Sequence, residues 1–271
     1  MDKPEYHQYK LMLFQFCGEA FRRQIMCNEK FSGNYRTTRG SGVHKGREVN
    51  LSQKKDTGTD LPISDITDAA RDVVVAKFGD DLILEDEYSG LSYSAVRDMA
   101  IDSTIRMVRK DFSFWQQAVQ PLEVELPIRV ELPAWPFNLA GKLDLIEIQR
   151  YNNGIAVRDS KTSNRTPPAD IATTSEQLTL YDMLCRAKFE RAPYELSYDY
   201  LIEMKHSIKT VRYPVQPNIE NQKALLARVA VMHDCIEKGS FAPCTPSFWK
   251  CSPEWCLCFP TCKYAMGRKG L

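Results

Sequence analysis

This 271-residue sequence lacks the segments that would carry it into or across a membrane. Its first five residues, Met1 to Glu5, begin no apolar signal segment, and no apolar run reaches the roughly 20 residues that a spanning helix needs. It also lacks an excess of charge, since 36 Lys and Arg against 35 Asp and Glu leave a formal net charge of +1. We therefore expect a cytoplasmic protein without a membrane partner.

Common nucleotide-binding and hydrolase motifs are missing as well. The absence of Gly-x-x-x-x-Gly-Lys-Ser/Thr excludes a P-loop ATPase, and there is neither a Gly-x-Ser-x-Gly motif nor a dinucleotide-binding glycine fingerprint. We find no internal repeat and no coiled-coil heptads. The chain is long enough for one sizeable domain, or for a core with a helical subdomain.

A short motif, Asp159-Ser160-Lys161, follows Gly141-Lys142-Leu143-Asp144 by one predicted hairpin. Its strands are Phe137 to Ile148 and Ile155 to Lys161, and Tyr151-Asn152-Asn153-Gly154 between them contains Asn-Gly, a strong hairpin signal. Because side chains alternate along a strand, a loop of two or four residues puts Asp144 on the face of Asp159 and Lys161. A three-residue loop would not.

Two carboxylates and a lysine on one face suit the metal-dependent cleavage of a phosphodiester. Carboxylates bind Mg²⁺ or Mn²⁺ through oxygen, and such an ion polarises a phosphate and lowers the pKa of a water molecule. Lys161 could position that water or neutralise the charge that grows on the phosphate. The alternative is a solvated strand face with ordinary surface charges.

Two neighbouring motifs add to this face. Gln177 and Tyr181 are four apart in a predicted helix that runs to about Lys188, so they share one side of it. His44 follows Gly40 and Gly42 closely, and we expect these glycines to let the chain turn under a metal or phosphate. A surface or capping role for His44 remains the alternative.

Basic residues are concentrated upstream. Arg22 to Lys55 contains nine Lys and Arg against two Glu, and apart from His44 we expect residues 28–60 to form a loop. Such a segment is either a basic arm that tracks a phosphate backbone or a solvated surface loop.

The remaining chain predicts a scaffold of helices and strands. Glu123 and Glu125, in one predicted strand, are candidates for a further carboxylate near the metal. We expect helices over 6–26, 63–78, 92–115 and 218–238, a strand over 122–132, and a hairpin of strands 196–204 and 210–215.

The nine cysteines form a second pattern, because five of them fall between Cys244 and Cys262. In a cytosolic protein, clustered cysteines more often bind metal than form disulfides. A Cys₄ zinc site and reduced structural thiols both remain open. Cys185 and Cys235 lie on apolar faces of predicted helices, and we expect them in the core.

In order and approximate spacing, these motifs resemble those of the RecB-type exonucleases of the PD-(D/E)XK superfamily. The resemblance covers nearly the whole chain. It implies an α/β fold with a restriction-endonuclease-like core, a central mixed sheet flanked by helices. The implied parts of a single domain, 1–271, are a helical lobe (61–118), a catalytic sheet core (119–215) and a cysteine-rich tail (240–271) that packs with the N-terminal helix. The matching motifs are Cys17 with Phe21-Arg22, Gly40 to His44, Gly141 to Asp144, Asp159 to Lys161, Gln177 to Tyr181, and Cys251 to Cys262.

The resemblance also implies roles for single residues. His44, Asp144 and Asp159 would bind Mg²⁺ or Mn²⁺, with the Ser160 carbonyl as a further ligand. Lys161 would be the catalytic lysine. Gln177 and Tyr181 would support the site and contact DNA.

Some relatives, among them the AddB and CRISPR-adaptation nucleases, hold a [4Fe–4S] cluster with one N-terminal and three C-terminal cysteines. The corresponding residues here are Cys17, Cys251, Cys256 and Cys262. This chain departs from the pattern, since four residues instead of two separate Cys251 from Cys256 and Gly18 replaces a frequent proline. The alternative ligands are therefore Cys27, Cys244 and Cys258. Zn²⁺ is the alternative metal.

The function that the resemblance implies is a metal-dependent DNA exonuclease acting on single strands or DNA ends. Its setting would be recombination, repair or phage DNA processing in a bacterial, archaeal or phage-infected cytosol, with recombination or CRISPR-adaptation proteins as partners. One alternative is a non-catalytic DNA-binding or assembly module stapled by its metal–cysteine tail. Another is an iron–sulfur redox protein, which would not need the carboxylate–lysine face.

Overall fold

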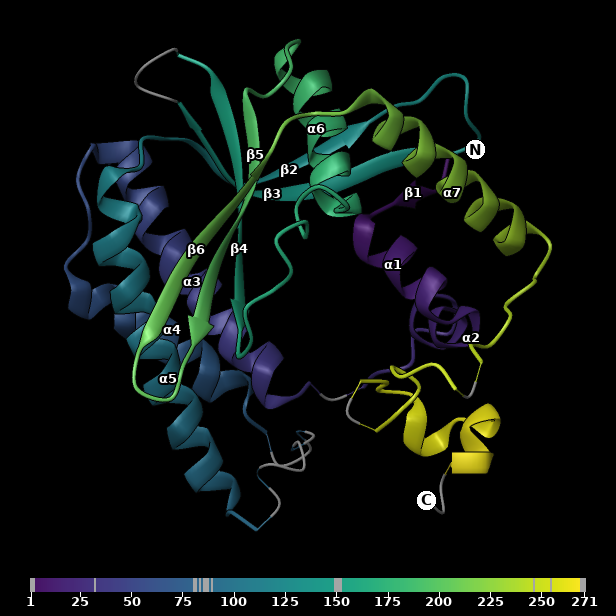
Figure 1. Cartoon of the computed structure of the whole chain (residues 1–271), viewed down its shortest axis with the longest axis horizontal. Coiled ribbons are helices and arrows are strands. Elements are labelled where there is room, and N and C mark those ends of the chain that lie inside the picture. Colours follow the sequence, from purple (N-terminus) through teal and green to yellow (C-terminus); the bar gives the residue numbers. More distant parts are fainter. Residues whose placement is uncertain are drawn as a thin grey trace.

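The computed structural model describes residues 3–31, 33–79, 82, 84, 88, 90–148, 153–245, 247–253 and 255–268. Its centre is a six-stranded mixed sheet with helices packed around it (Figure 1). This arrangement confirms the predicted α/β fold. The strands are β1 (Glu5–Tyr6), β2 (Pro121–Val130), β3 (Asn138–Ile148), β4 (Ile155–Ser163), β5 (Glu195–Glu203) and β6 (Ile208–Val215).

Strand β3 is the centre of the sheet. It pairs antiparallel with β2 along most of its length, parallel with β1 at its start and antiparallel with β4 at its end. Strands β4 and β5 are parallel, and a parallel pair needs a crossover connection, which here contains helix α6 (Glu176–Phe189). Strand β6 then returns antiparallel to β5 as the predicted hairpin.

Two groups of helices pack around the sheet. Helices α3 (Tyr35–Thr57), α4 (Ile63–Lys77) and α5 (Tyr93–Phe114) join through one apolar cluster that includes Val43, Ile66 and Met107. Helices α1 (Gln8–Phe16), α6 and α7 (Ile219–Glu237) pack with the strands in the largest cluster. The predicted helices near 63–78, 92–115 and 218–238 are therefore confirmed. Short elements complete the chain: α2 (Gly18–Phe21), a π-helix (Arg22–Met26) and 3₁₀ turns at Gln116–Ala118, Phe259–Thr261 and Lys263–Arg268.

The segment expected to be one helix over 6–26 is instead divided at Cys17. This residue has extended backbone angles, with φ −164° and ψ 114°. The next amide, that of Gly18, donates a hydrogen bond to the Ala242 carbonyl at 2.9 Å and so ties the break to the start of the C-terminal tail.

The loop expected over residues 28–60, apart from His44, is also wrong, because most of this segment forms helix α3, with His44 near its middle. Asn34 and Thr37 form a capping box at the start of α3, and Gly58 ends it with φ 76°. The nearby glycine Gly42 therefore makes no turn. A Cβ at Gly42 would lie 2.8 Å from the side chains of Thr104 and Val74, so this glycine lets α3 pack closely on α4 and α5.

The basic residues of this region do not form an extended arm. Arg39 and Arg47 are buried in α3, where Arg39 pairs with Glu203 of β5. Arg47 bonds Asp111 of α5 at 3.3 Å and Asp199 of β5 at 3.1 Å. Their charges hold helices on the sheet, since a buried charge must be paired.

The β3–β4 connection is longer than either loop considered. Ile148 pairs with Ile155, so residues 149–154 connect the two strands, and of these residues 149–152 lie outside the described residues. The register nevertheless keeps the expected alternation, and Asp144 and Asp159 take facing positions. Across the described ranges, no helix is both long and apolar enough to span a membrane.

Candidate metal centre

The centre lies where the pairing of β3 with β4 stops. The last pair is Leu145–Arg158, and Asp144 and Asp159 are the next residues on the two strands. Past this point the amide of Ser160 donates a hydrogen bond to Asp144 Oδ2 at 3.1 Å, so one carboxylate replaces a strand carbonyl as its acceptor. Both carboxylates consequently lie at an opening in the sheet.

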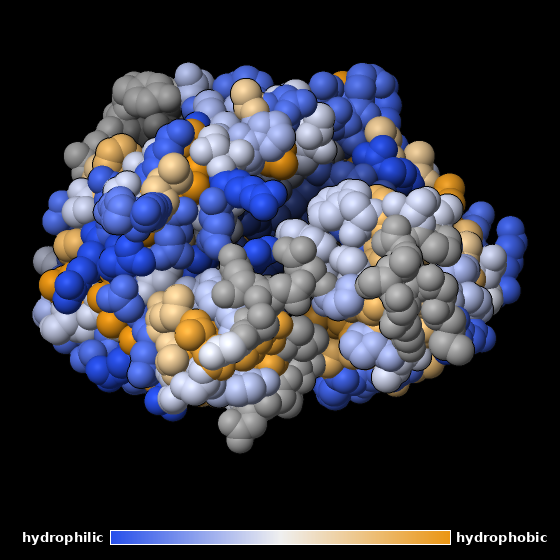
Figure 2. Space-filling view, turned by 60° about the horizontal axis from the view of Figure 1, so that its bottom comes forward, coloured by the Kyte–Doolittle hydropathy of each residue, from blue (hydrophilic) through white to orange (hydrophobic). Residues whose placement is uncertain are grey.

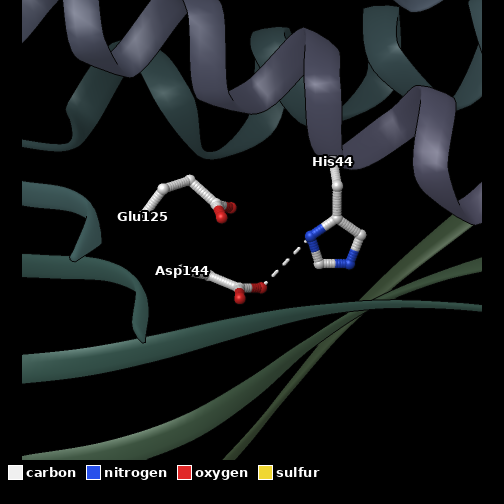
Figure 3. A group of neighbouring side chains, drawn as sticks. All are labelled: His44, Glu125 and Asp144. Atoms are coloured by element: carbon white, nitrogen blue, oxygen red, sulfur yellow. Dashed lines mark ion pairs between the residues drawn. The ribbon is translucent and has the colours of Figure 1, made fainter. Parts of the chain in front are cut away.

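Three side chains meet on one side of this opening. His44 Nδ1 of α3 lies 3.2 Å from Asp144 Oδ2, and together with Glu125 each offers one ligand atom within 4.8 Å of the others. Figure 3 shows the three pointing toward one another from α3 and the neighbouring strands. One imidazole nitrogen and two carboxylate oxygens are a donor set that fits a divalent cation.

Glu125 was only one of two candidate carboxylates in the sequence. It stands between Val124 and Leu126, which pair with Leu145 and Leu143, so it is opposite Asp144. Its φ of 50° lies in the left-handed region, a strained conformation for a residue other than glycine. The other candidate, Glu123, pairs with Lys55 at 3.2 Å and is not part of the group.

Asp159 is held by side chains of β4 and α6. Lys161 Nζ lies 2.6 Å from its Oδ2, and Gln177 Nε2 donates to its Oδ1 at 2.8 Å. The Tyr181 hydroxyl lies 3.3 Å from the same Oδ1 and 2.9 Å from the carbonyl of Lys142. Helix α6 thus fixes the Asp159 carboxylate, which lies on β4, the strand that also carries Lys161.

Gly141 explains how α6 comes so close. A Cβ at this position would lie 2.7 Å from Leu184 Cδ1 and 3.8 Å from the ring of Tyr181. The glycine of the Gly141–Asp144 motif therefore makes room for the helix that carries Gln177 and Tyr181, which its spacing in the sequence did not reveal.

Burial and charge oppose each other in this centre. Burial, and then the charge of Asp159, raises the pKa of Asp144 to about 6, although His44 and Lys161 act in the opposite direction. Burial disfavours the Lys161 ammonium, but Asp159 and Asp144 outweigh it and raise the pKa of Lys161. Burial and Asp159 also raise the pKa of Tyr181, so its hydroxyl stays neutral. Around Asp144 the centre is thus short of positive charge, while Glu125 pairs with Lys142.

A second group of polarisable side chains lies at the C-terminal tail. One cavity is lined by six cysteines, and the Cys244 amide donates to Cys17 Sγ at 3.3 Å. The four cysteines expected as cluster ligands all line this cavity, whereas Cys27 is exposed and does not line it, and Cys185 lies in the core. The six are Cys17, Cys244, Cys251, Cys256, Cys258 and Cys262.

Several thiols of this cavity hydrogen-bond one another: Cys244 with Cys17 and Cys251, and Cys256 with Cys258. No three thiol sulfurs of the described residues lie within 4.8 Å of one another. Burial and its neighbour Cys17 raise the pKa of Cys244 to about 12, and a hydrogen bond from Cys256 lowers the pKa of Cys258 to about 7.

One face of the molecule is hollowed. Figure 2 shows a recess near the centre of this face, edged mainly by hydrophilic side chains.

Comparisons with known proteins agree with this geometry. The family model of the PD-(D/E)XK nuclease superfamily matches residues 8–265. No curated protein matches the sequence. The crystal structure of a candidate exonuclease from Eubacterium rectale has a TM-score of 0.52 at 13% identity, covering 98% of this chain and 88% of its own. The structure of SSO0001 has a TM-score of 0.40 at 13% identity, covering 95% and 96%. The first of these likenesses shows a shared fold.

Proposed function

The chain belongs to the PD-(D/E)XK nuclease superfamily, and we propose that it is a metal-dependent deoxyribonuclease that acts on single-stranded DNA or DNA ends. The observation that carries this proposal is the meeting of five elements at one opening in the sheet. Helix α3 supplies His44, β2 supplies Glu125, β3 supplies Asp144, and β4 supplies Asp159 and Lys161. Helix α6 supports them.

His44, Glu125 and Asp144 are the residues that would hold the ion, which we propose to be Mg²⁺ or Mn²⁺. Their nitrogen and oxygen donors and their excess of negative charge fit a hard divalent cation. When bound, the ion would supply positive charge that polarises the phosphate and makes a nearby water more acidic. Asp159 and the Ser160 carbonyl remain proposed as additional ligands on β4.

Lys161 is the proposed catalytic lysine. Its ammonium stays charged at neutral pH and projects from the strand next to Asp144, where it can neutralise the charge that develops on a phosphate. Gln177 and Tyr181 hold Asp159 and thereby the orientation of Lys161. We propose that these two side chains also contact DNA at the edge of the site.

The proposed substrate and setting follow from less specific observations. The hydrophilic recess in Figure 2 suits a polyanionic strand, and the structure with the same fold from Eubacterium rectale bears the name of an exonuclease. None of the nine cysteines, all within the described ranges, forms a disulfide, which fits a reducing cytosol. We propose recombination, repair or phage DNA processing as the setting, with recombination or CRISPR-adaptation proteins as partners.

Substituting Lys161→Ala tests the proposal. Incubated with end-labelled linear DNA and Mn²⁺, the wild type should release labelled products, and the variant should lose at least about 100-fold in rate because the charge at the phosphate is gone. Binding of DNA should remain. Single-stranded, duplex and circular substrates in the same assay distinguish exonuclease from endonuclease action.

Lys223→Ala is the matched control, since Lys223 is an exposed lysine of α7 that pairs only with Glu220 in the described structure. It should cleave like the wild type. Cleavage that survives in Lys161→Ala would refute the assignment. Binding of DNA without metal-stimulated cleavage by the wild type would favour the binding-module alternative.

We further propose that the cysteine cavity holds a [4Fe–4S] cluster. The cavity is lined by six cysteines, and all four predicted ligands are among them, so it offers a full set of thiolate donors for such a cluster. Cys17, Cys251, Cys256 and Cys262 are the proposed ligands, and the cluster would link the first helices to the tail.

The iron and sulfide content of anaerobically purified protein tests this second proposal. Cys17→Ser should lose most of the iron and the visible absorption, because it removes the ligand that comes from the N-terminal part. Cys185→Ser, a buried cysteine of the α6 core, should keep both. Stoichiometric zinc without iron in the wild type would contradict the proposal in favour of the zinc alternative.

A further inference from the structure

Two tryptophans of the C-terminal tail are largely exposed. Trp249 is 57% exposed and Trp255 is 46% exposed, and their ring centroids lie 5.2 Å apart with an interplanar angle of 79°. Large aromatic rings contribute strongly to a core when they are buried, so a pair left at the surface marks a place for a binding partner.

Each tryptophan has a cation beside its ring. Lys250 Nζ lies 5.2 Å from the centroid of Trp249, and the Arg36 guanidinium lies 5.7 Å from that of Trp255. Among the described residues the Lys250 ammonium lies over two aromatic rings, those of Trp249 and Phe16, and such contacts leave its charge available to an anion. We call Arg36, Trp249, Lys250 and Trp255 the tryptophan surface.

The tryptophan surface continues toward the metal centre. Arg36 lies in the first turn of α3, and His44 follows eight residues later on the same helix. At about 1.5 Å per residue the two are about 12 Å apart along the helix axis. In Figure 1 the tail, drawn in yellow, lies near the start of α3, and the Arg36–Trp255 contact joins the two. A ligand on the tryptophan surface is thus within a few nucleotides of the carboxylates.

We propose that the tryptophan surface is a stacking platform for single-stranded DNA. Trp249 and Trp255 would each stack on an unpaired base, with the two bases turned away from each other because the rings are nearly perpendicular, and Lys250 and Arg36 would contact the neighbouring phosphates. Alternating aromatic and cationic groups match a chain that alternates bases and phosphates. Duplex DNA does not fit this surface, because its bases hide their faces in the stack.

The charge of the tail supports an anionic partner. Between Cys244 and Arg268 the sequence has three basic residues, Lys250, Lys263 and Arg268, and one acidic residue, Glu254. The platform rests on the proposed function in one respect: the single strand that it binds would be the substrate of the metal centre. Binding itself needs no cleavage.

Binding of a fluorescently labelled oligothymidylate to Lys161→Ala protein tests the platform without degradation of the probe. Adding Trp249→Ala and Trp255→Ala together should raise the Kd by about 30-fold or more, since each lost stacking contact costs several-fold in affinity. Affinity for a blunt duplex of equal length should change by less than about threefold, because backbone contacts dominate duplex binding.

Two control variants keep the result specific. Phe114→Ala removes another exposed aromatic, 54% exposed, with Lys110 Nζ 5.1 Å from its ring, but on α5. It should leave oligothymidylate binding unchanged. Trp249→Phe with Trp255→Phe keeps two aromatic faces and should retain most of the affinity, whereas a structural disturbance of the tail would lower it as much as alanine does.

Several outcomes would overturn the platform. These are an alanine variant that binds like the Phe114→Ala control, an equal loss for the duplex, an equal loss in the phenylalanine variant, and no binding of oligothymidylate by the parent protein. A wild type that cleaves DNA while the alanine variant binds normally would leave the nuclease intact and remove the platform. If the wild type never cleaves DNA but the alanine variant shows the expected loss of oligothymidylate binding, the platform would stand and the proposed nuclease activity would be contradicted.

Discussion

Asp144 is partly buried, with 13% of its side chain exposed, and it lies between groups of both signs. Burial and Asp159 disfavour its charged form, while His44 and Lys161 favour it. A carboxylate with a raised pKa is relieved either by a proton or by a metal ion. The residue proposed for chemistry is therefore also a source of instability in the metal-free protein.

The variant Asp144→Asn should be more stable than the wild type without metal at pH 8. The folded protein binds a proton at Asp144 below about pH 6, while the unfolded chain does so only below its ordinary value of 3.8. Wild-type stability should thus fall as the pH rises from about 4 to about 6, by at most about 3 kcal/mol. The asparagine variant avoids this loss. Thermal unfolding in a chelator should show an advantage of several degrees at pH 8 that disappears near pH 4.

Asp159→Asn is the contrasting variant. It removes the negative charge that lies 2.6 Å from Lys161 Nζ and leaves a partly buried ammonium with less compensation. Its melting temperature at pH 8 should be lower than that of the wild type. A wild type more stable than Asp144→Asn at pH 8 would show that the centre is not short of positive charge.

At the scale of elements, α3 depends on close contact rather than on its own sequence. Gly42→Ala should destabilise the protein by about 1–3 kcal/mol through overpacking, even though alanine favours helix by about 1 kcal/mol. The added Cβ would lie 2.9 Å from the backbone oxygen of Ala70, which cannot simply rotate away.

Unfolding in urea measures this effect. Asp56→Ala, at an exposed position near the end of the same helix, is the control and should leave the midpoint nearly unchanged. An alanine at position 42 that raises the midpoint would mean that helix propensity exceeds the packing cost, contrary to the close approach of α3 to α4 and α5.

Much of the element pattern could be predicted from the sequence, and α3 shows why the remainder could not. Apolar residues alternate along the hairpin of β3 and β4 and along the hairpin of β5 and β6. In α4, α5 and α7 the apolar residues have helical spacing. Local sequence signals were therefore sufficient to predict these elements. Helix α3 instead buries Arg39, Arg47 and Asn50, whose partners lie far away in sequence. A helix held by buried polar contacts has no apolar stripe and looks like a loop.

The site shows the same division. Its motif residues could be predicted because alternation in β3 and β4 fixes Asp144 against Asp159. Glu125 could not be separated from Glu123, because the two are alike in sequence and only the strained backbone at Glu125 turns it toward His44. The glycines of both motifs serve helix packing, which depends on residues not yet placed when the sequence alone is considered.

At the scale of the whole molecule, the N-terminal segment joins both the sheet and the C-terminal tail. Strand β1 pairs with the start of β3, and Cys17 joins the tail cysteines around one cavity. The tail also reaches the start of α3, where the Arg36 guanidinium lies 5.7 Å from the Trp255 ring centroid, and one face of the molecule carries the hydrophilic recess (Figure 2). Loss of the proposed cluster should loosen the contact between the tail and the first helices. It should weaken single-strand binding more than it destabilises the sheet.

The most direct test of the account is Mn²⁺-dependent cleavage of end-labelled DNA by the wild type and by Asp144→Asn, purified and assayed side by side. The account predicts cleavage that saturates with Mn²⁺ in the wild type and a loss of at least about 100-fold in the variant, despite a higher melting temperature without metal. Equal rates in the two proteins would contradict the assignment of the centre at Asp144.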